Sequence, residues 1–154
     1  MKKINLEIIR KNYWLITLVS AIMVYVSVLV PSWSGIEESN FINAWYWGFY
    51  TWEGALEVLE SELMMPGVIV GIILLIGATL ILFSALYTKR KDENKPLFNL
   101  IGGIISIIAP IIFIFSMVGV YSEFWLSYFA TVGLILPFIG GSLAIISWYS
   151  LKRS

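Results

Sequence analysis

The sequence predicts an all-α membrane protein, a four-transmembrane-helix bundle with a structured first outer loop. Only 13% of its 154 residues are charged and 59% are hydrophobic, which leaves too little polar surface for a soluble domain of this size. Four apolar stretches lack Lys, Arg, Asp, Glu and His in their interior, and each approaches or exceeds the roughly 18–20 residues that span a bilayer. Within a single domain (1–154), the predicted helices cover residues 13–30, 66–87, 96–120 and 124–149.

The distribution of charge predicts the orientation of these helices. All ten basic residues lie before the first stretch, after the last, or between the second and third. Residues 31–65 contain acids and no base. By the positive-inside rule we expect an integral protein of the plasma or cytoplasmic membrane, with both termini cytoplasmic and loop 31–65 outside. The basic side suits anionic lipid headgroups, and the acidic side suits cations or basic partners.

The absent residue types exclude several kinds of chemistry. The chain has no Cys and no His, so disulfides, thiol chemistry and the commonest metal ligand and general base are missing. The polar groups that we identify inside the predicted helices are hydroxyls, such as those of Thr17, Ser20 and Ser106, which offer no proton relay. We therefore expect no enzyme activity, no cofactor, no metal and no nucleic-acid partner.

Loop 31–65 is long enough to fold, and its residue pattern changes near Trp52. Residues 41–54 read FINAWYWGFYTWEG, and the alternation of rings with other side chains predicts a strand or hairpin. From Trp52 to Met65, leucines and glutamates recur on separate stripes at helical spacing. This pattern predicts a short amphipathic helix that ends before Pro66, where the next span would begin.

Two groups of loop residues are candidates for its function. The tryptophans suit a belt at the membrane surface, a packed loop core or a docking surface for another protein. Glutamates at i, i+4 and i+7 would share one helical face, which suits a partner or a calcium or magnesium ion, although an exposed polar face explains them as well. The first group comprises Trp33, Trp45, Trp47, Trp52 and Gly54, and the second comprises Glu53, Glu57 and Glu60.

Small residues in the predicted spans are spaced for close approach between helices, which is how helices associate in lipid. We expect this packing to lie within the molecule. Pro110 and Pro137 fall in mid-span and should kink their helices. The packing candidates are Gly67, Gly71, Gly102, Gly140 and Gly141.

Pro31-Ser32-Trp33 resembles the exit from the first span of the claudin-like superfamily, which includes the peripheral-myelin and epithelial-membrane proteins. Either Gly48-Phe49-Tyr50 or Glu53-Gly54-Ala55-Leu56 resembles the Gly-Leu-Trp element that follows in claudins, whereas their loop cysteine pair is missing. The layout of a long first and a short second outer loop is also similar. The resemblance implies a small β-sheet followed by a short helix in the first loop, and a role in adhesion, side-by-side assembly or membrane organisation.

The sequence leaves several functions open. We expect a protein without enzyme activity whose outer loop contacts other membrane proteins or further copies of itself, in addition to membrane lipids. The alternatives are an accessory subunit bound through its glycine-rich helix faces, a cation channel built from several copies, and an enzyme acting on lipids beside Pro110 or Pro137.

Overall fold

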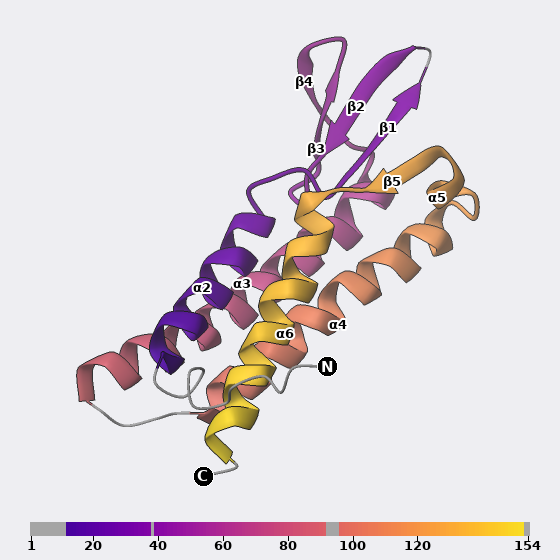
Figure 1. The fold of residues 1–154 in the computed structure, drawn as a ribbon. Helices are drawn as coiled ribbons and strands as arrows, with labels where there is room; N and C mark the ends of the chain where they lie inside the picture. The colour runs from indigo at the N-terminus through magenta and orange to yellow at the C-terminus, as the bar shows by residue number, and fades with distance from the viewer. Residues whose placement is uncertain (1–11, 38, 92–95, 153–154) are drawn as a thin grey trace, which may run out of the picture.

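The structure is a computed structural model that describes residues 12–37, 39–91 and 96–152. It is mostly helical, and a small antiparallel sheet covers one end of a helix bundle (Figure 1). The helices are α2 (Tyr13–Ser27), α3 (Ser61–Lys91), α4 (Pro96–Val120), α5 (Phe124–Ser127) and α6 (Val132–Lys152). The strands are β1 (Trp33–Glu37), β2 (Asn40–Ala44), β3 (Phe49–Trp52), β4 (Ala55–Val58) and β5 (Tyr128–Ala130).

The long helices form a ring in which α2 and α4 each pack against both α3 and α6. Their backbones come close together at glycines. A Cβ atom added to Gly141 would lie 2.7 Å from the carbonyl oxygen of Gly103, and one added to Gly140 would lie 2.9 Å from that of Ser20. A Cβ atom on Gly102 would lie 2.7 Å from a carbonyl oxygen of α3. Three of the glycines assigned to helix packing therefore lie at helix crossings.

Three helices in the described ranges are long and apolar enough to cross a membrane, which supports a membrane protein: 61–88 of α3, all of α4, and 132–151 of α6. Helix α2 is apolar but has only 15 residues. At 1.5 Å per residue it is about 22 Å long, shorter than the ~30 Å hydrocarbon core of a bilayer. The helix expected over residues 13–30 ends at Ser27 because the chain turns there toward β1.

Other helix limits differ from the prediction in informative ways. Helix α4 has the predicted limits, whereas α3 begins at Ser61 and includes Pro66. The carbonyl that loses its helical partner to this proline belongs to Glu62, which is exposed at the end of the helix. The single helix predicted over 124–149 is wrong, since α5 and β5 precede α6.

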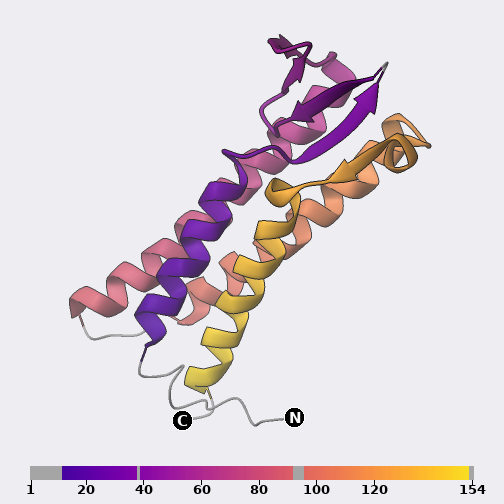
Figure 2. The ribbon, with the colours of Figure 1, turned by 45° about the horizontal axis from the view of Figure 1, so that its top comes forward.

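The sheet joins two connections that are far apart in the sequence. Its strand order is β4-β3-β2-β1-β5, with every neighbouring pair antiparallel. Strand β5, from the connection between α4 and α6, pairs with β1, from the connection between α2 and α3. The expected β element is thus confirmed as part of a larger sheet (Figure 2).

The amphipathic helix expected from Trp52 to Met65 is wrong. Its first part turns at Glu53 and Gly54 and returns as β4, paired with β3. Both turn residues have positive φ, 49° and 82°, as the commonest two-residue hairpin turn requires. The tight turn thus commits the following residues to an antiparallel strand.

Candidate functional site

We call the part of the chain at the sheet end of the bundle the cap (residues 28–37, 39–60 and 121–131). Two of its tryptophans close the end of α2. The indole nitrogen of Trp47 donates to the carbonyl oxygen of Val28 at 2.7 Å, and that of Trp45 donates to Leu29 at 3.2 Å. Carbonyls at a helix C-terminus lack intrahelical partners. The rings therefore satisfy the end of α2 while they attach the cap to it.

Tyr46, between these tryptophans, is fully buried and reaches α6. Its hydroxyl donates to the carbonyl oxygen of Gly133 at 3.4 Å. That carbonyl has no helical donor, because the residue four positions later is Pro137. The Tyr46 ring meets Phe113 of α4 edge to face, with the ring centroids 5.1 Å apart, and burial raises the pKa of its hydroxyl.

Gly67 and Gly71, which we assigned to helix packing, receive the cap instead of another helix. A Cβ atom on Gly67 would lie 2.6 Å from the carbonyl oxygen of Tyr46, and one on Gly71 would lie 3.5 Å from the ring of Trp47. The small residues at the start of α3 therefore provide the space into which the turn between β2 and β3 fits.

Trp33 is the centre of a second ring cluster, which joins the two connections of the cap. It lies edge to face with Phe124 and Tyr128, at centroid distances of 5.1 and 4.7 Å. Gly35 makes room for Tyr128, because a Cβ atom there would lie 2.2 Å from the tyrosine ring. The cluster therefore buries the first strand of the sheet against α5 and β5.

Backbone hydrogen bonds hold the Pro31-Ser32-Trp33 segment in place. The N–H of Ser32 donates to the carbonyl of Ala44 at 2.7 Å, and its own carbonyl accepts from Thr131 at 3.2 Å. The N–H of Gly133 donates to the carbonyl of Pro31 at 2.9 Å. The entry to β1 is thus bonded both to β2 and to the start of α6.

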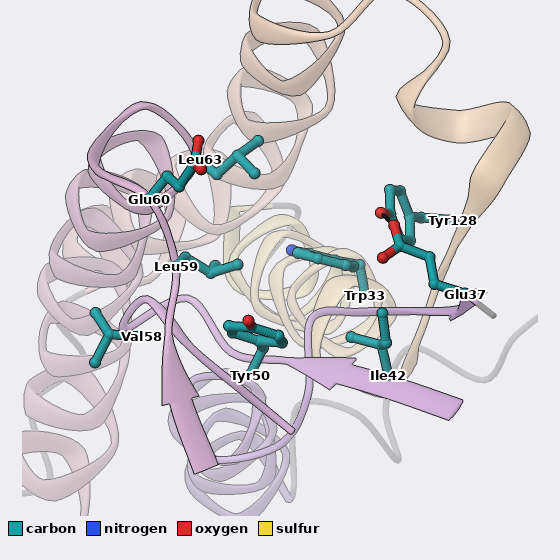
Figure 3. A pocket seen from close by; sticks show the side chains of 9 residues that line it. All are labelled: Trp33, Glu37, Ile42, Tyr50, Val58, Leu59, Glu60, Leu63 and Tyr128. Atoms are coloured by element: carbon teal, nitrogen blue, oxygen red, sulfur yellow. Dashed lines mark hydrogen bonds between the residues drawn. The ribbon is translucent and has the colours of Figure 1, made fainter. Parts of the chain in front are cut away.

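A cavity of about 340 Å³ lies between the sheet and the start of α3 (Figure 3). Its wall combines aromatic rings, aliphatic side chains and two carboxylates, a composition typical of ligand pockets with a few oriented polar groups. The lining residues are Trp33, Glu37, Ile42, Tyr50, Val58, Leu59, Glu60, Leu63 and Tyr128.

Tyrosine hydroxyls bind two of the carboxylates in and beside this cavity. Tyr50 donates to Oε2 of Glu57 at 2.5 Å, and Tyr128 donates to Oε1 of Glu37. The hydrogen bond to Glu57 is the main cause that raises the pKa of Tyr50. Ionisation of the phenol would break this hydrogen bond and would place a second negative charge beside the Glu57 carboxylate.

The three glutamates predicted to share a helical face lie on different elements. Glu53 occupies the turn after β3 and accepts a hydrogen bond from Asn40 at 3.2 Å. Glu57 belongs to β4, and Glu60 precedes α3, where its carbonyl accepts the N–H of Leu63 at 3.0 Å. The expected acidic stripe is therefore wrong, and the described residues contain no group of three or more acids that could hold a metal ion.

Strand β4 forms one edge of the sheet, and all four of its residues are exposed. Leu56 and Val58 are 66% and 63% exposed. The two remaining loop candidates lie nearby: Trp52 ends β3 and packs, partly buried, against the hydrophobic core, and Gly54 occupies the turn with open space around it.

Sequence reasoning missed one polar residue inside the bundle. Asn99 of α4 is fully buried, and its amide nitrogen donates to Thr17 of α2 at 3.2 Å and to the carbonyl of Ala144 in α6 at 3.0 Å. The signal was an amide inside a predicted span, where a polar side chain links helices.

No protein-family model matches the chain, and a search of the curated proteins finds no similar sequence. The fold and site define a helical protein with membrane-compatible helices and a β-sheet cap. The cap offers two surfaces, the exposed edge of β4 and the cavity beneath the sheet.

Proposed function

We propose that this chain is a four-span membrane protein without enzyme activity whose cap binds another membrane protein along β4. The edge position of β4 is the observation that carries the proposal. An edge strand offers backbone N–H and C=O groups to an added strand, and such edges are normally shielded by charge, proline or a covering segment. Here Leu56 and Val58 lie exposed on that edge.

Charge favours a partner with a basic segment over a second copy of this chain. No Lys or Arg occurs within residues 12–88 or 96–151, so the carboxylates of the cap have no basic counterpart on a neighbouring cap. Complementary charge speeds encounter and selects the partner, whereas like charges oppose association. We therefore assign Glu57, on the opposite face of the same edge strand, to recognition of a Lys or Arg.

Helix α2 is the fourth span in this proposal. It lies beside α3 and α6 in the bundle (Figures 1 and 2). Its exposed apolar side chains recur at helical spacing and form a stripe that suits lipid. The stripe consists of Leu15, Val19, Ile22 and Val26.

The orientation and the claudin-like relationship are parts of the same proposal. The described glutamates lie at the cap end, while α3 and α6 end in Lys91 and Lys152 at the other, which supports a cap outside the cell. The sheet between α2 and α3, with Trp33 in its first strand, supports a distant claudin-like protein. Association through glycine faces is less favoured, because Gly102, Gly140 and Gly141 contact helices of this chain.

Site-specific photo-cross-linking in native membranes tests the proposal. A cross-linker at position 56 should give one dominant adduct with a membrane protein whose outer segment contains Lys or Arg, and Glu57→Lys should abolish it. Position 126 is the matched control, because Leu126 is 86% exposed but lies away from β4. If the only adducts are with a second copy of this chain, the partner is the chain itself and the basic partner is refuted. Equal cross-linking yields from positions 56 and 126 would refute β4 as the binding surface.

A further inference from the structure

Trp33 differs in its hydrogen bonding from three other tryptophans of the protein. Trp45, Trp47 and Trp125 each donate their indole N–H to a backbone carbonyl. The N–H of Trp33 has no acceptor in the described part of the chain, although this side chain is only 3% exposed. Its nitrogen points into the cavity beneath the sheet (Figure 3). Tryptophan has only this donor, and in Trp33 it faces the cavity without an acceptor among the described residues, so this cavity is suited to a ligand that supplies one.

The remaining polar groups of the cavity favour a positive charge. Glu37 and Glu60 contribute carboxylates, and Tyr50 and Tyr128 contribute aromatic rings, a group that attracts cations. The carboxylate of Glu60 has no partner among the residues that the structure describes. The aliphatic part of the wall suits alkyl groups on the same ligand.

We propose that this cavity binds an organic ammonium compound that also carries a neutral oxygen acceptor, with choline as the simplest example. Its ammonium group would lie against Glu37, Glu60 and the tyrosine rings, and its oxygen would accept the N–H of Trp33. The volume of about 340 Å³ falls in the range of small-molecule sites. The carboxylates disfavour a ligand whose acceptor is itself a carboxylate. The same chemistry is found in free amino alcohols and in choline lipid headgroups.

The test is a titration of the purified full chain in phosphatidylglycerol nanodiscs, followed through the indole N–H resonances. Choline should shift the Trp33 resonance saturably, and Trp33→Phe identifies that resonance. Tetramethylammonium lacks the oxygen and should bind without the same shift. Dimethylbutanol, in which carbon replaces the charged nitrogen of choline, should not bind.

A pair of variants separates this cavity from the general acidity of the cap. Glu60→Gln should weaken choline binding about tenfold, because a carboxylate that faces the ammonium group is neutralised. Glu62→Gln removes the same charge from an exposed position outside the cavity wall and should leave the affinity unchanged. Unshifted Trp45 and Trp47 resonances establish that both variants keep their fold.

Three results would overturn the proposal: no saturable shift with choline, equal binding of choline and dimethylbutanol, or equal weakening by the two variants. Repeating the titration in phosphatidylcholine nanodiscs identifies the source of the ligand. Weaker binding of free choline there supports occupancy by the lipid headgroup, and unchanged binding supports a free amino alcohol. The test needs no protein partner, so it can fail while the β4 interface stands, and the reverse also holds.

Discussion

The helix bundle and the cap are held together by different kinds of contact. In the bundle, backbones approach where side chains are smallest, as at Gly103 and Gly141. In the cap, large rings fill the space, as where Trp33 meets Phe124 and Tyr128. Lipid gives helices no hydrophobic drive to associate, so close packing must hold them. At a water boundary the burial of rings is itself favourable.

The two regions meet at the turn between β2 and β3, and this junction uses both kinds of contact. Tyr46 and Trp47 supply the rings, and Gly67 and Gly71 supply the space on α3. Indole N–H groups also satisfy carbonyls at the end of α2. A chain without cysteine thus fixes its cap by ring burial and hydrogen bonds.

The largest effect is expected from removing the central ring of the cap. Trp33→Ala should destabilise the protein by about 3–5 kcal/mol, the usual cost of truncating a buried aromatic side chain. The loss should be confined to the cap, so amide exchange should accelerate in β1, β2 and β5 while α4 and α6 stay protected. Leu126→Ala, at an exposed position, is the control. Equal acceleration throughout the helices would show that cap and bundle unfold as one unit.

A bulky residue at a helix crossing should destabilise the bundle. In Gly141→Leu the new side chain would meet the carbonyl oxygen of Gly103, 2.7 Å from the added Cβ. Because backbone cannot yield as a flexible side chain does, we expect a loss of about 3 kcal/mol in unfolding experiments in mixed micelles. Gly119→Leu is the matched control, since a Cβ atom there meets nothing within 4 Å. A similar loss in both variants would contradict the role of close packing.

Intermediate effects should come from the bonds between cap and α2. Trp47→Phe keeps a ring but removes the 2.7 Å hydrogen bond to Val28, at an expected cost of about 1 kcal/mol. Trp45→Phe removes the longer, exposed bond to Leu29 and should cost less. Unfolding free energies with amide exchange at residues 24–30 measure both. A larger loss from Trp45→Phe would reverse our assignment of the stronger contact.

Hydrophobic runs predicted the membrane-compatible helices but not where strands interrupt them. The limits of α4 follow from its apolar run, and the aromatic residues before Trp52 predicted a strand. Strand β4 was missed because its residues ALEV also fit a helical period, and the turn at Glu53-Gly54 with pairing to β3 decided the outcome. Strand β5 was hidden in an apolar run, where pairing with β1 overrides helix propensity.

The candidate site was only partly predictable from the sequence. Trp33 could be selected from its position after the first span, and Glu60 was selected for a helical face that does not exist. The cavity combines β1, β2, β3, β4 and the start of α3 with Tyr128 from the other connection. No local sequence pattern predicts that residues so far apart in the chain line one cavity, because their proximity depends on which strands pair.

The smallest effect is expected at the exposed hydrogen bond between Tyr50 and Glu57, at the surface of the cap. This bond raises the pKa of Tyr50 above the ordinary tyrosine value. A folded-state pKa that is raised contributes stability below the ordinary value, and this contribution is lost as the pH rises through the folded value. Glu57→Gln should therefore lower the pKa of Tyr50, measured from the ring carbon resonances of labelled tyrosine, and should weaken the pH dependence of stability above pH ~10. Glu62→Gln keeps the bond and should change neither. An unchanged Tyr50 pKa in Glu57→Gln would mean that the Tyr50 hydroxyl donates its hydrogen bond to water, and not to the Glu57 carboxylate, in the folded cap.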